Sequence, residues 1–238
     1  MTREEFSNGF DVLLNSYSTS IMSSPAPQDI ILDEYEKSVF LTMAQEQEVL
    51  SLYNGKNISG ESLEATEELR RYLSSLTKED ELEPIVTTNG KPLGVSSTSK
   101  FFTLPPDLWF ITYESVTVSD GKCGENSSMN VFPVRQDEYN NIKKNPFRGA
   151  NDRRALRLDL ADSVVEIVCK YTVTKYYIRY LKELTPIVLQ DFTADGLSVN
   201  GTSTATDCEL PKYLHQRILE AAVLLALRTK GINVSENK

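Results

Sequence analysis

Histidine is almost absent from this sequence of 238 residues, in which His215 is the single example. One histidine excludes a metal site built on two imidazoles, and it leaves at most one imidazole base for catalysis. His215 follows Leu214 in an amphipathic segment near the C-terminus. We expect it to be an ordinary, exposed or half-buried histidine on a helix rather than a member of a catalytic triad.

Cysteine is also scarce, and Cys123, Cys169 and Cys208 lie far apart in the chain. An odd number of cysteines without a C-x-x-C pair excludes a disulfide framework and argues against a structural zinc site. Cys169 alternates with apolar residues, so we expect a buried and inert thiol. A chain of this length can fold on its own hydrophobic core in a reducing compartment, and we expect no metal or other cofactor.

Long apolar runs are lacking as well. The longest such run near the C-terminus covers residues 221–227, whereas a membrane span needs about 20 residues. The first residues are polar and acidic, without the basic and apolar regions of a signal peptide. We therefore expect a soluble protein that is not exported by a cleaved signal and has no membrane partner.

Signatures of catalysis are missing too. Neither the G-x-x-x-x-G-K-[ST] nor the G-x-G-x-x-G phosphate-binding motif occurs. Carboxylates are frequent in residues 61–83, where paired acids could serve in acid–base or Mg²⁺ chemistry. Because they follow the polar side of a predicted helix and its exit, we interpret them as a solvated face. An enzyme is the least favoured class.

Charge is present in quantity but is unevenly distributed. The whole chain has a net charge of −9 and a pI of about 4.8. Residues 1–83 hold 17 acidic and six basic side chains, a net charge of −11, whereas residues 84–238 have a net charge of +2. Such a division would let the acidic part of one copy attract a basic part of another copy. The alternative is that the acidic part is a solvent-exposed surface without a partner.

Residues 1–83 read as an acidic helical region. An amphipathic arm helix is predicted over 1–17 and a Ser/Pro-rich linker over 18–28. A second helix begins after Asp33, with Glu36 as a capping-box partner, and ends at Gly55; a third opens at Ser62. Four apolar residues of the arm are candidates for docking on a partner, with packing inside the same chain as the alternative: Phe6, Phe10, Leu13 and Leu14.

Residues 84–207 change to a β-rich pattern. Short alternating or β-branched runs predict strands over 109–118, 129–134, 156–160, 164–171, 173–181 and 187–189. Short connections without helical periodicity predict an antiparallel β meander. Residues 208–238 predict an amphipathic helix and a polar tail, and we expect that helix to pack with the helical region. The fold class is therefore α+β.

The most unusual segment runs from Lys143 to Arg157 and combines six basic residues with a single acid, Asp152. An aromatic residue at the tip of a Pro/Gly turn, among arginines, is typical of protein interfaces. The candidate subunit-interface residues are Lys144, Phe147, Arg148, Arg153, Arg154 and Arg157. The same basic 143–157 loop could instead bind nucleic acid, although the acidic pI argues against it, or could be a solvated loop.

Several further segments lie in a distinctive order. They are residues 33–46, 52–55, 66–73, 137–139, 144–148, 177–182, 185–189 and 208–223. Together they resemble a structural ring protein of crAss-like tailed bacteriophages, of the head–tail connector or adaptor type. No one of these segments is highly specific by itself, but their order is, and the resemblance covers most of the chain, about residues 33–230.

This resemblance implies a virion protein of the tail connector rather than an enzyme, assembled in the cytoplasm of the host bacterium. It implies a homo-oligomeric ring, with twelve copies expected, that docks to the portal protein and to other tail ring proteins. DNA would pass through its channel without specific binding. The family has no catalytic residues to carry over. A nucleic-acid-binding module that uses the 143–157 loop stays as the alternative.

Overall fold

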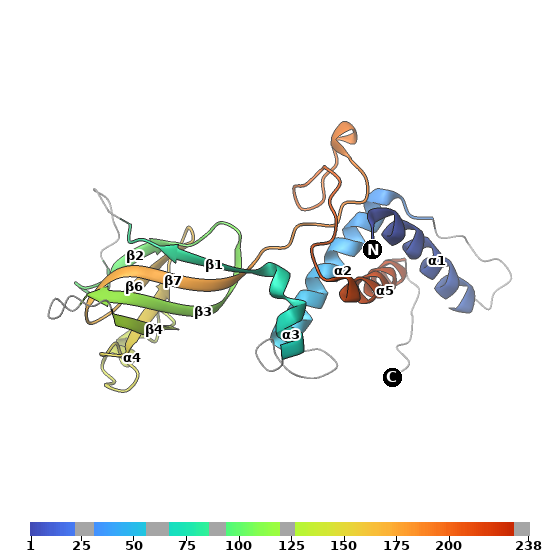
Figure 1. Cartoon of the computed structure of the whole chain (residues 1–238). Helices are drawn as coiled ribbons and strands as arrows, with labels where there is room; N and C mark the ends of the chain where they lie inside the picture. Colours follow the sequence, from blue (N-terminus) through green and yellow to red (C-terminus); the bar gives the residue numbers. More distant parts are fainter. Residues whose placement is uncertain (22–30, 56–66, 86–93, 120–126, 231–238) are drawn as a thin grey trace. The chain divides into compact units, whose positions relative to one another are not determined.

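The computed structural model describes residues 1–21, 31–55, 67–85, 94–119 and 127–230 (Figure 1). The chain divides into two compact units, Met1–Leu76 with Leu184–Lys238, and Thr77–Glu183. We call them the helical unit and the sheet unit. Helices followed by a sheet and a final helix confirm the predicted α+β class.

The helical unit is built on three long helices. The bounds of its helices are α1 Arg3–Ile21, α2 Glu34–Asn54, α3 Glu67–Tyr72, η1 Ser74–Leu76, η2 Thr193–Asp195 and α5 Lys212–Thr229. The C-terminal helix α5 packs against both α1 and α2. Because α1 continues to Ile21, the first residues of the expected linker are helical; its remainder and the polar tail from residue 231 lie outside the described residues.

Local signals place the ends of α2 where the sequence predicts them. The Asp33 side chain accepts a hydrogen bond from the backbone N–H of Glu36 at 2.7 Å, and the Glu36 side chain accepts one from the backbone N–H of Asp33 at 3.3 Å. Gly55 ends the helix in the left-handed conformation, with φ of 71°. The predicted capping box and stop are both confirmed, because each depends only on neighbours in sequence.

Two contacts hold α1 in place. Gly9 allows a close approach to α5, since a Cβ atom at this position would lie 2.9 Å from Cδ2 of Leu219. The ammonium of Lys37 on α2 is buried and lies 2.8 Å from carboxylate oxygens of both Asp11 and Glu34. Burial alone would lower the pKa of Lys37, but hydrogen bonds from its ammonium to these two carboxylates raise it.

The buried position of His215 corrects the expectation of an ordinary exposed or half-buried helix residue. Its side chain is buried, its Nε2 lies 2.8 Å from the carbonyl oxygen of Leu210, and its ring centroid lies 5.2 Å from that of Phe6. The prediction was wrong because α5 is covered by two helices, so its buried face is wider than one stripe. Burial lowers the pKa of His215 below 6.5.

The depressed pKa of His215 predicts a loss of stability in mild acid. Below pH 6.5 the unfolded chain binds a proton that the folded chain resists, so the free energy of unfolding falls as the pH is lowered. The groups that face the imidazole are the amino group of Met1, Lys212 and Glu5. Urea titrations between pH 7.5 and 5.5 should show that the free energy of unfolding falls more steeply as the pH is lowered for the natural chain than for His215→Gln. The same slope for both chains would contradict the prediction.

The sheet unit contains one seven-stranded sheet in the order β1-β7-β3-β4-β5-β6-β2. Its elements are β1 Thr77–Leu82, β2 Lys100–Thr103, β3 Leu108–Ser119, β4 Ser127–Pro133, α4 Tyr139–Lys143, β5 Arg154–Asp159, β6 Val164–Val168 and β7 Thr172–Lys182. Most predicted strands are present, but residues 187–189 contribute only an isolated bridge, Val188 to Thr206.

The sheet is mixed rather than a purely antiparallel meander. Strands β4 and β5 run parallel, while the other pairs are antiparallel. The connection between them, residues 134–153, contains α4 and is long enough to return the chain to the starting end of β4. Parallel neighbours need such a crossover. The short α4 lacks an amphipathic period, and the sequence reasoning missed it.

Strand β1 lies inside the region that was expected to be helical. Its sequence is T-K-E-D-E-L, and it forms one edge of the sheet beside β7. Glu79 pairs with Arg179 at 2.6 Å across the two strands, and Glu81 pairs with Lys175. An exposed edge strand needs no alternating apolar residues, and edge charges prevent unwanted strand addition, so hydrophobic periodicity could not reveal it.

The core of the sheet unit lies inside the curl of the sheet. Tyr176 is fully buried near its centre, with its ring centroid 5.3 Å from that of Phe102. Cys169 is buried in the same cluster, as predicted, and burial raises the pKa of its thiol. In the described ranges, none of the helices combines the length and apolar character that crossing a membrane would require.

Candidate subunit interface

The turn that follows α4 presents Phe147 to solvent. The Asn145 side-chain oxygen accepts hydrogen bonds from the backbone N–H of Phe147 at 2.9 Å and of Arg148 at 3.2 Å. The N–H of Gly149 closes the turn on the carbonyl oxygen of Asn145 at 2.8 Å. These bonds fix the backbone without burying the aromatic ring, and Phe147 is 84% exposed.

Arg154 supports this turn from the first position of β5. Its Nη1 donates a hydrogen bond to the carbonyl oxygen of Phe147 at 3.1 Å. Its guanidinium carbon lies 4.2 Å from the ring centroid of Phe132 on β4, which is a cation–π contact. Arg154 is itself half-buried and joins the turn of the exposed Phe147 to Phe132, which is 40% exposed, in one surface.

The cations around the turn are largely uncompensated. Lys144, Arg148 and Arg153 are exposed, and none of them forms an ion pair with any residue in the described parts of the chain. The one acid within residues 143–157, Asp152, is already engaged by Lys170 at 2.6 Å, and the hydrogen bond from Lys170 lowers the pKa of Asp152. The surface therefore carries net positive charge around exposed aromatic rings.

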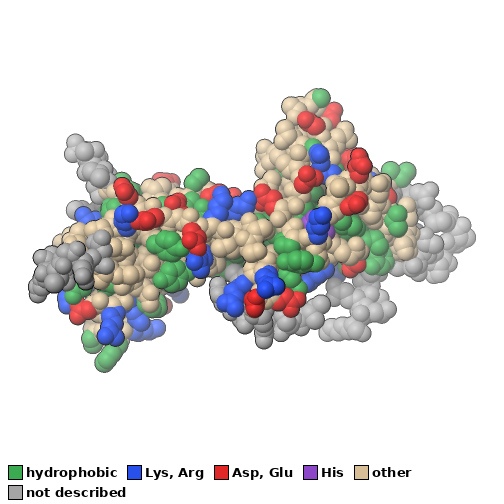
Figure 2. Space-filling model, viewed as in Figure 1, with side chains coloured by type: hydrophobic (Ala, Val, Ile, Leu, Met, Phe, Trp, Pro, Cys, Tyr) green, Lys and Arg blue, Asp and Glu red, His purple; other side chains and the backbone are tan. Residues whose placement is uncertain are grey.

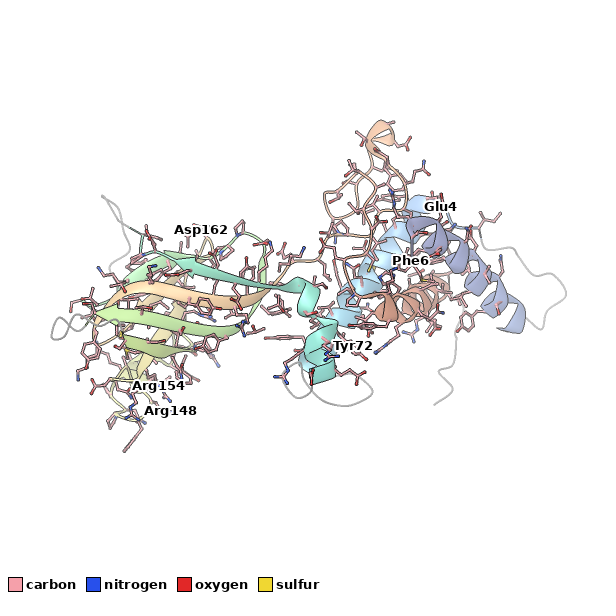
Figure 3. All side chains as sticks on the ribbon, viewed as in Figure 1. Glu4, Phe6, Tyr72, Arg148, Arg154 and Asp162 are labelled. Atoms are coloured by element: carbon pink, nitrogen blue, oxygen red, sulfur yellow. The ribbon has the colours of Figure 1, made fainter. Side chains whose placement is uncertain are left out.

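We call this surface the basic tip. Its residues are Phe132, Lys144, Phe147, Arg148, Arg153 and Arg154. Figure 3 shows Arg148 and Arg154 at the same end of the sheet unit, and Figure 2 shows basic side chains gathered around a hydrophobic point there. The sequence could not reveal Phe132, because only the pairing of β4 with β5 brings it to Arg154.

Arg157 does not belong to the basic tip, which corrects its expected place in the interface. Its side chain is 12% exposed and its Nη1 lies 3.0 Å from Oε2 of Glu114. The same carboxylate oxygen accepts a hydrogen bond from Tyr176 at 2.6 Å, and Asp159 lies 2.9 Å from the Arg157 Nε. The charge of Arg157 is thus used inside the sheet unit, because Arg157 shares a face of β5 with the buried Ala155, where Glu114 and Tyr176 enclose it.

The candidate docking arm is also largely enclosed. Phe6, Phe10 and Leu14 are each 1% exposed or less in the core of the helical unit, while Leu13 is half-buried. Val12, on the outer side of the same helix, is 68% exposed. The structure therefore favours the alternative, packing within the same chain, for the three buried residues.

An acidic surface lies elsewhere on the same sheet unit. It consists of β1 and the residue that follows it, and we call it the acidic edge: Glu79, Asp80, Glu81 and Glu83. Asp80 and Glu83 form no ion pair with the described residues. Three strands separate β1 from β5 in the sheet, and Figure 1 shows β1 and α4 on opposite sides of this unit.

Comparisons with known proteins agree over nearly the whole chain. The model of a family described as phage tail ring protein 3/4 matches residues 1–238. "Ring protein 3" of Bacteroides phage crAss001 is 48% identical over 233 residues, which cover 97% of this chain and 96% of that protein. "Ring protein 4/5" of the same phage is 31% identical over 234 residues, which cover 95% and 92%.

Proposed function

The chain belongs to the phage tail ring protein 3/4 family, and from this premise we propose that it closes into a ring by joining its basic tip to the acidic edge of the next copy. It is a structural tail ring protein and a virion component of a crAss-like bacteriophage. The observation that carries the proposal is Phe147, held 84% exposed by a fixed turn among uncompensated cations.

A closed ring needs two different surfaces on each subunit. In a head-to-tail contact, one patch meets a second patch on the next copy, and rotation closes the ring. The basic tip and the acidic edge have opposite charge and lie on opposite sides of one compact unit. Arginine and aromatic residues frequently dominate the binding energy of such contacts, while complementary charges direct encounter and register.

The assembly that we propose is a ring of twelve copies between the portal and the tail. It would dock to the portal protein and to other ring proteins, form part of the DNA conduit during ejection, and assemble in the cytoplasm of the host bacterium. The net charge of −9 supports passage of DNA without specific binding. In this role the protein is not an enzyme and uses no cofactor.

The test is to remove the basic tip and measure ring formation. We expect Phe147→Ala to weaken self-association about tenfold or more, because it removes a central contact. We expect the double variant Arg148→Glu with Arg153→Glu to have an effect of the same size, because its new charges repel the acidic edge of the partner. Light scattering and native mass spectrometry, with and without the portal protein, would measure the mass. Asp80→Lys with Glu83→Lys should restore assembly of the double arginine variant.

The matched control reverses two exposed charges of the helical unit, with Arg70→Glu and Lys212→Glu, and so changes the net charge equally. Assembly of this control should stay near that of the natural chain. Unchanged ring formation by both basic-tip variants would overturn the proposed contact. Tight, salt-sensitive DNA binding by the isolated monomer would instead favour the nucleic-acid-binding alternative.

A further inference from the structure

A cavity of about 260 Å³ lies beside α4 in the sheet unit. Its walls are about equally polar and apolar: Val95, Phe101, Leu158 and Leu160 lie beside Gln136, Tyr139, Asn140, Lys143 and Glu166. Pockets for whole small-molecule ligands are typically larger, about 300–1,000 Å³. This cavity is closer in size to a single long side chain than to a cofactor.

The floor of the cavity carries a buried carboxylate. Glu166 on β6 is 2% exposed, and the sheet register places Phe101 and Leu158 directly across from it on the neighbouring strands. Its Oε1 accepts a hydrogen bond from the backbone N–H of Val95 at 2.7 Å. Burial, and secondarily the charge of Glu166, raise the pKa of Tyr139, which agrees with a carboxylate close to that phenol.

No cation of the described chain neutralises this carboxylate. Glu166 forms no ion pair with any residue in the described ranges. Lys143 lines the same cavity, but its ammonium lies over the ring of Tyr139, 5.9 Å from the centroid. A buried carboxylate is costly unless hydrogen-bond donors or an opposite charge reach it, and the one hydrogen bond from Val95 leaves Oε2 of Glu166 without a donor among the described residues. Among the described residues, Lys143 is therefore the one cation that lines the cavity, and it forms no ion pair with Glu166.

We propose that this cavity receives a basic side chain, arginine or lysine, from the adjoining copy of the chain. The walls would contact its aliphatic stem, and Glu166 would accept hydrogen bonds from its charged end. This inference rests on the proposed ring. The basic tip follows α4 directly in the chain, and α4 contributes Tyr139 and Lys143 to the cavity, so a copy that docks on the tip also reaches the cavity.

The acidic edge of the next copy and the adjacent strand β7 offer suitable side chains. Lys78 on β1, and Lys175 and Arg179 on the adjacent strand β7, have side chains that are 49%, 50% and 47% exposed. Their ion pairs with Asp107, Glu81 and Glu79, respectively, are solvent-exposed, and exposed pairs are weak enough to exchange. A contact between the two surfaces therefore brings a basic side chain to the cavity along with the acids.

The first experiment tests the cavity without any ring. Butylguanidinium is titrated into the full chain and followed by NMR, with n-butanol as a probe that lacks the charge. We expect butylguanidinium to bind saturably with a Kd on the order of 1–10 mM, with chemical-shift changes centred on Phe101 and Leu158. Butylguanidinium should bind the Glu166→Gln variant at least about tenfold more weakly, and butanol should bind the natural chain at least about tenfold more weakly. Equal binding to the variant, or no saturable binding up to about 100 mM, would overturn the inference.

The second experiment measures ring formation by Glu166→Gln, with the exposed Glu183→Gln as its matched control. We expect Glu166→Gln to weaken assembly about tenfold or more while the isolated chain is at least as resistant to urea, because an unpaired buried charge has been removed. A merely structural role would lower stability instead. If the basic-tip variants block ring assembly but Glu166→Gln does not, the inference about the cavity fails and the proposed ring contact stands. If butylguanidinium binds to the cavity but the basic-tip variants form rings normally, the proposed ring contact fails.

Discussion

Replacing Arg157 with methionine should destabilise the sheet unit by about 3–5 kcal/mol, because it leaves a buried charge without its partner. Glu114 is 9% exposed and is held by the Arg157 guanidinium at 3.0 Å and the Tyr176 hydroxyl at 2.6 Å. Methionine has a similar apolar stem, so the loss reports the missing charge rather than a cavity. The single tryptophan, Trp109, lies on β3, so its fluorescence during urea unfolding reports this unit.

A second substitution separates the charge from the packing. Adding Glu114→Gln to Arg157→Met removes the orphaned charge but keeps an acceptor for Tyr176, and should recover about 2 kcal/mol. Arg153→Met is the matched control, because Arg153 is exposed and forms no ion pair with described residues; its effect should stay within about 0.5 kcal/mol. If Arg157→Met is as harmless as this control, the network does not stabilise the fold.

Arg157 also shows where prediction from the sequence stops. Six basic residues within 143–157 favour a single surface, and for Lys144, Arg148 and Arg153 the structure does place the side chains in solvent. Arg157 has the same charge and a similar neighbourhood in sequence. Its partner Glu114 is 43 positions away and is brought to it only by the sheet. Residue type and spacing carry no information on such a pairing.

The same distinction holds for the whole fold. Features that depend on near neighbours, such as the capping box at Asp33 and the strand around Trp109, could be predicted. Features that depend on distant contacts could not: the charged edge strand β1, the parallel pairing of β4 with β5, and burial of His215 beneath α1. The cavity at Glu166 belongs to the second group, since its walls come from several separated segments.

Replacing Phe10 with alanine should destabilise the helical unit by about 3–5 kcal/mol even in the isolated chain. Phe10 is 0% exposed, and the other buried residues of the same stripe, Phe6 and Leu14, are each 1% exposed. Far-ultraviolet circular dichroism reports the helices, whereas Trp109 reports the sheet unit. We expect the helical signal to be lost at lower urea while the tryptophan transition stays near its original midpoint.

The Phe10→Ala result also decides between two roles for α1. A helix that docks on a partner would keep its apolar side chains exposed in the isolated chain. The substitution would then change the free energy of unfolding of the isolated chain very little. Val12→Ala provides the matched control, because Val12 lies on the same helix and is 68% exposed. A large loss for Phe10→Ala with none for Val12→Ala would assign the buried stripe to folding and leave the outer face of α1 for contacts in the assembly. Equally small losses of stability for Phe10→Ala and Val12→Ala would instead favour the role of α1 as a docking arm.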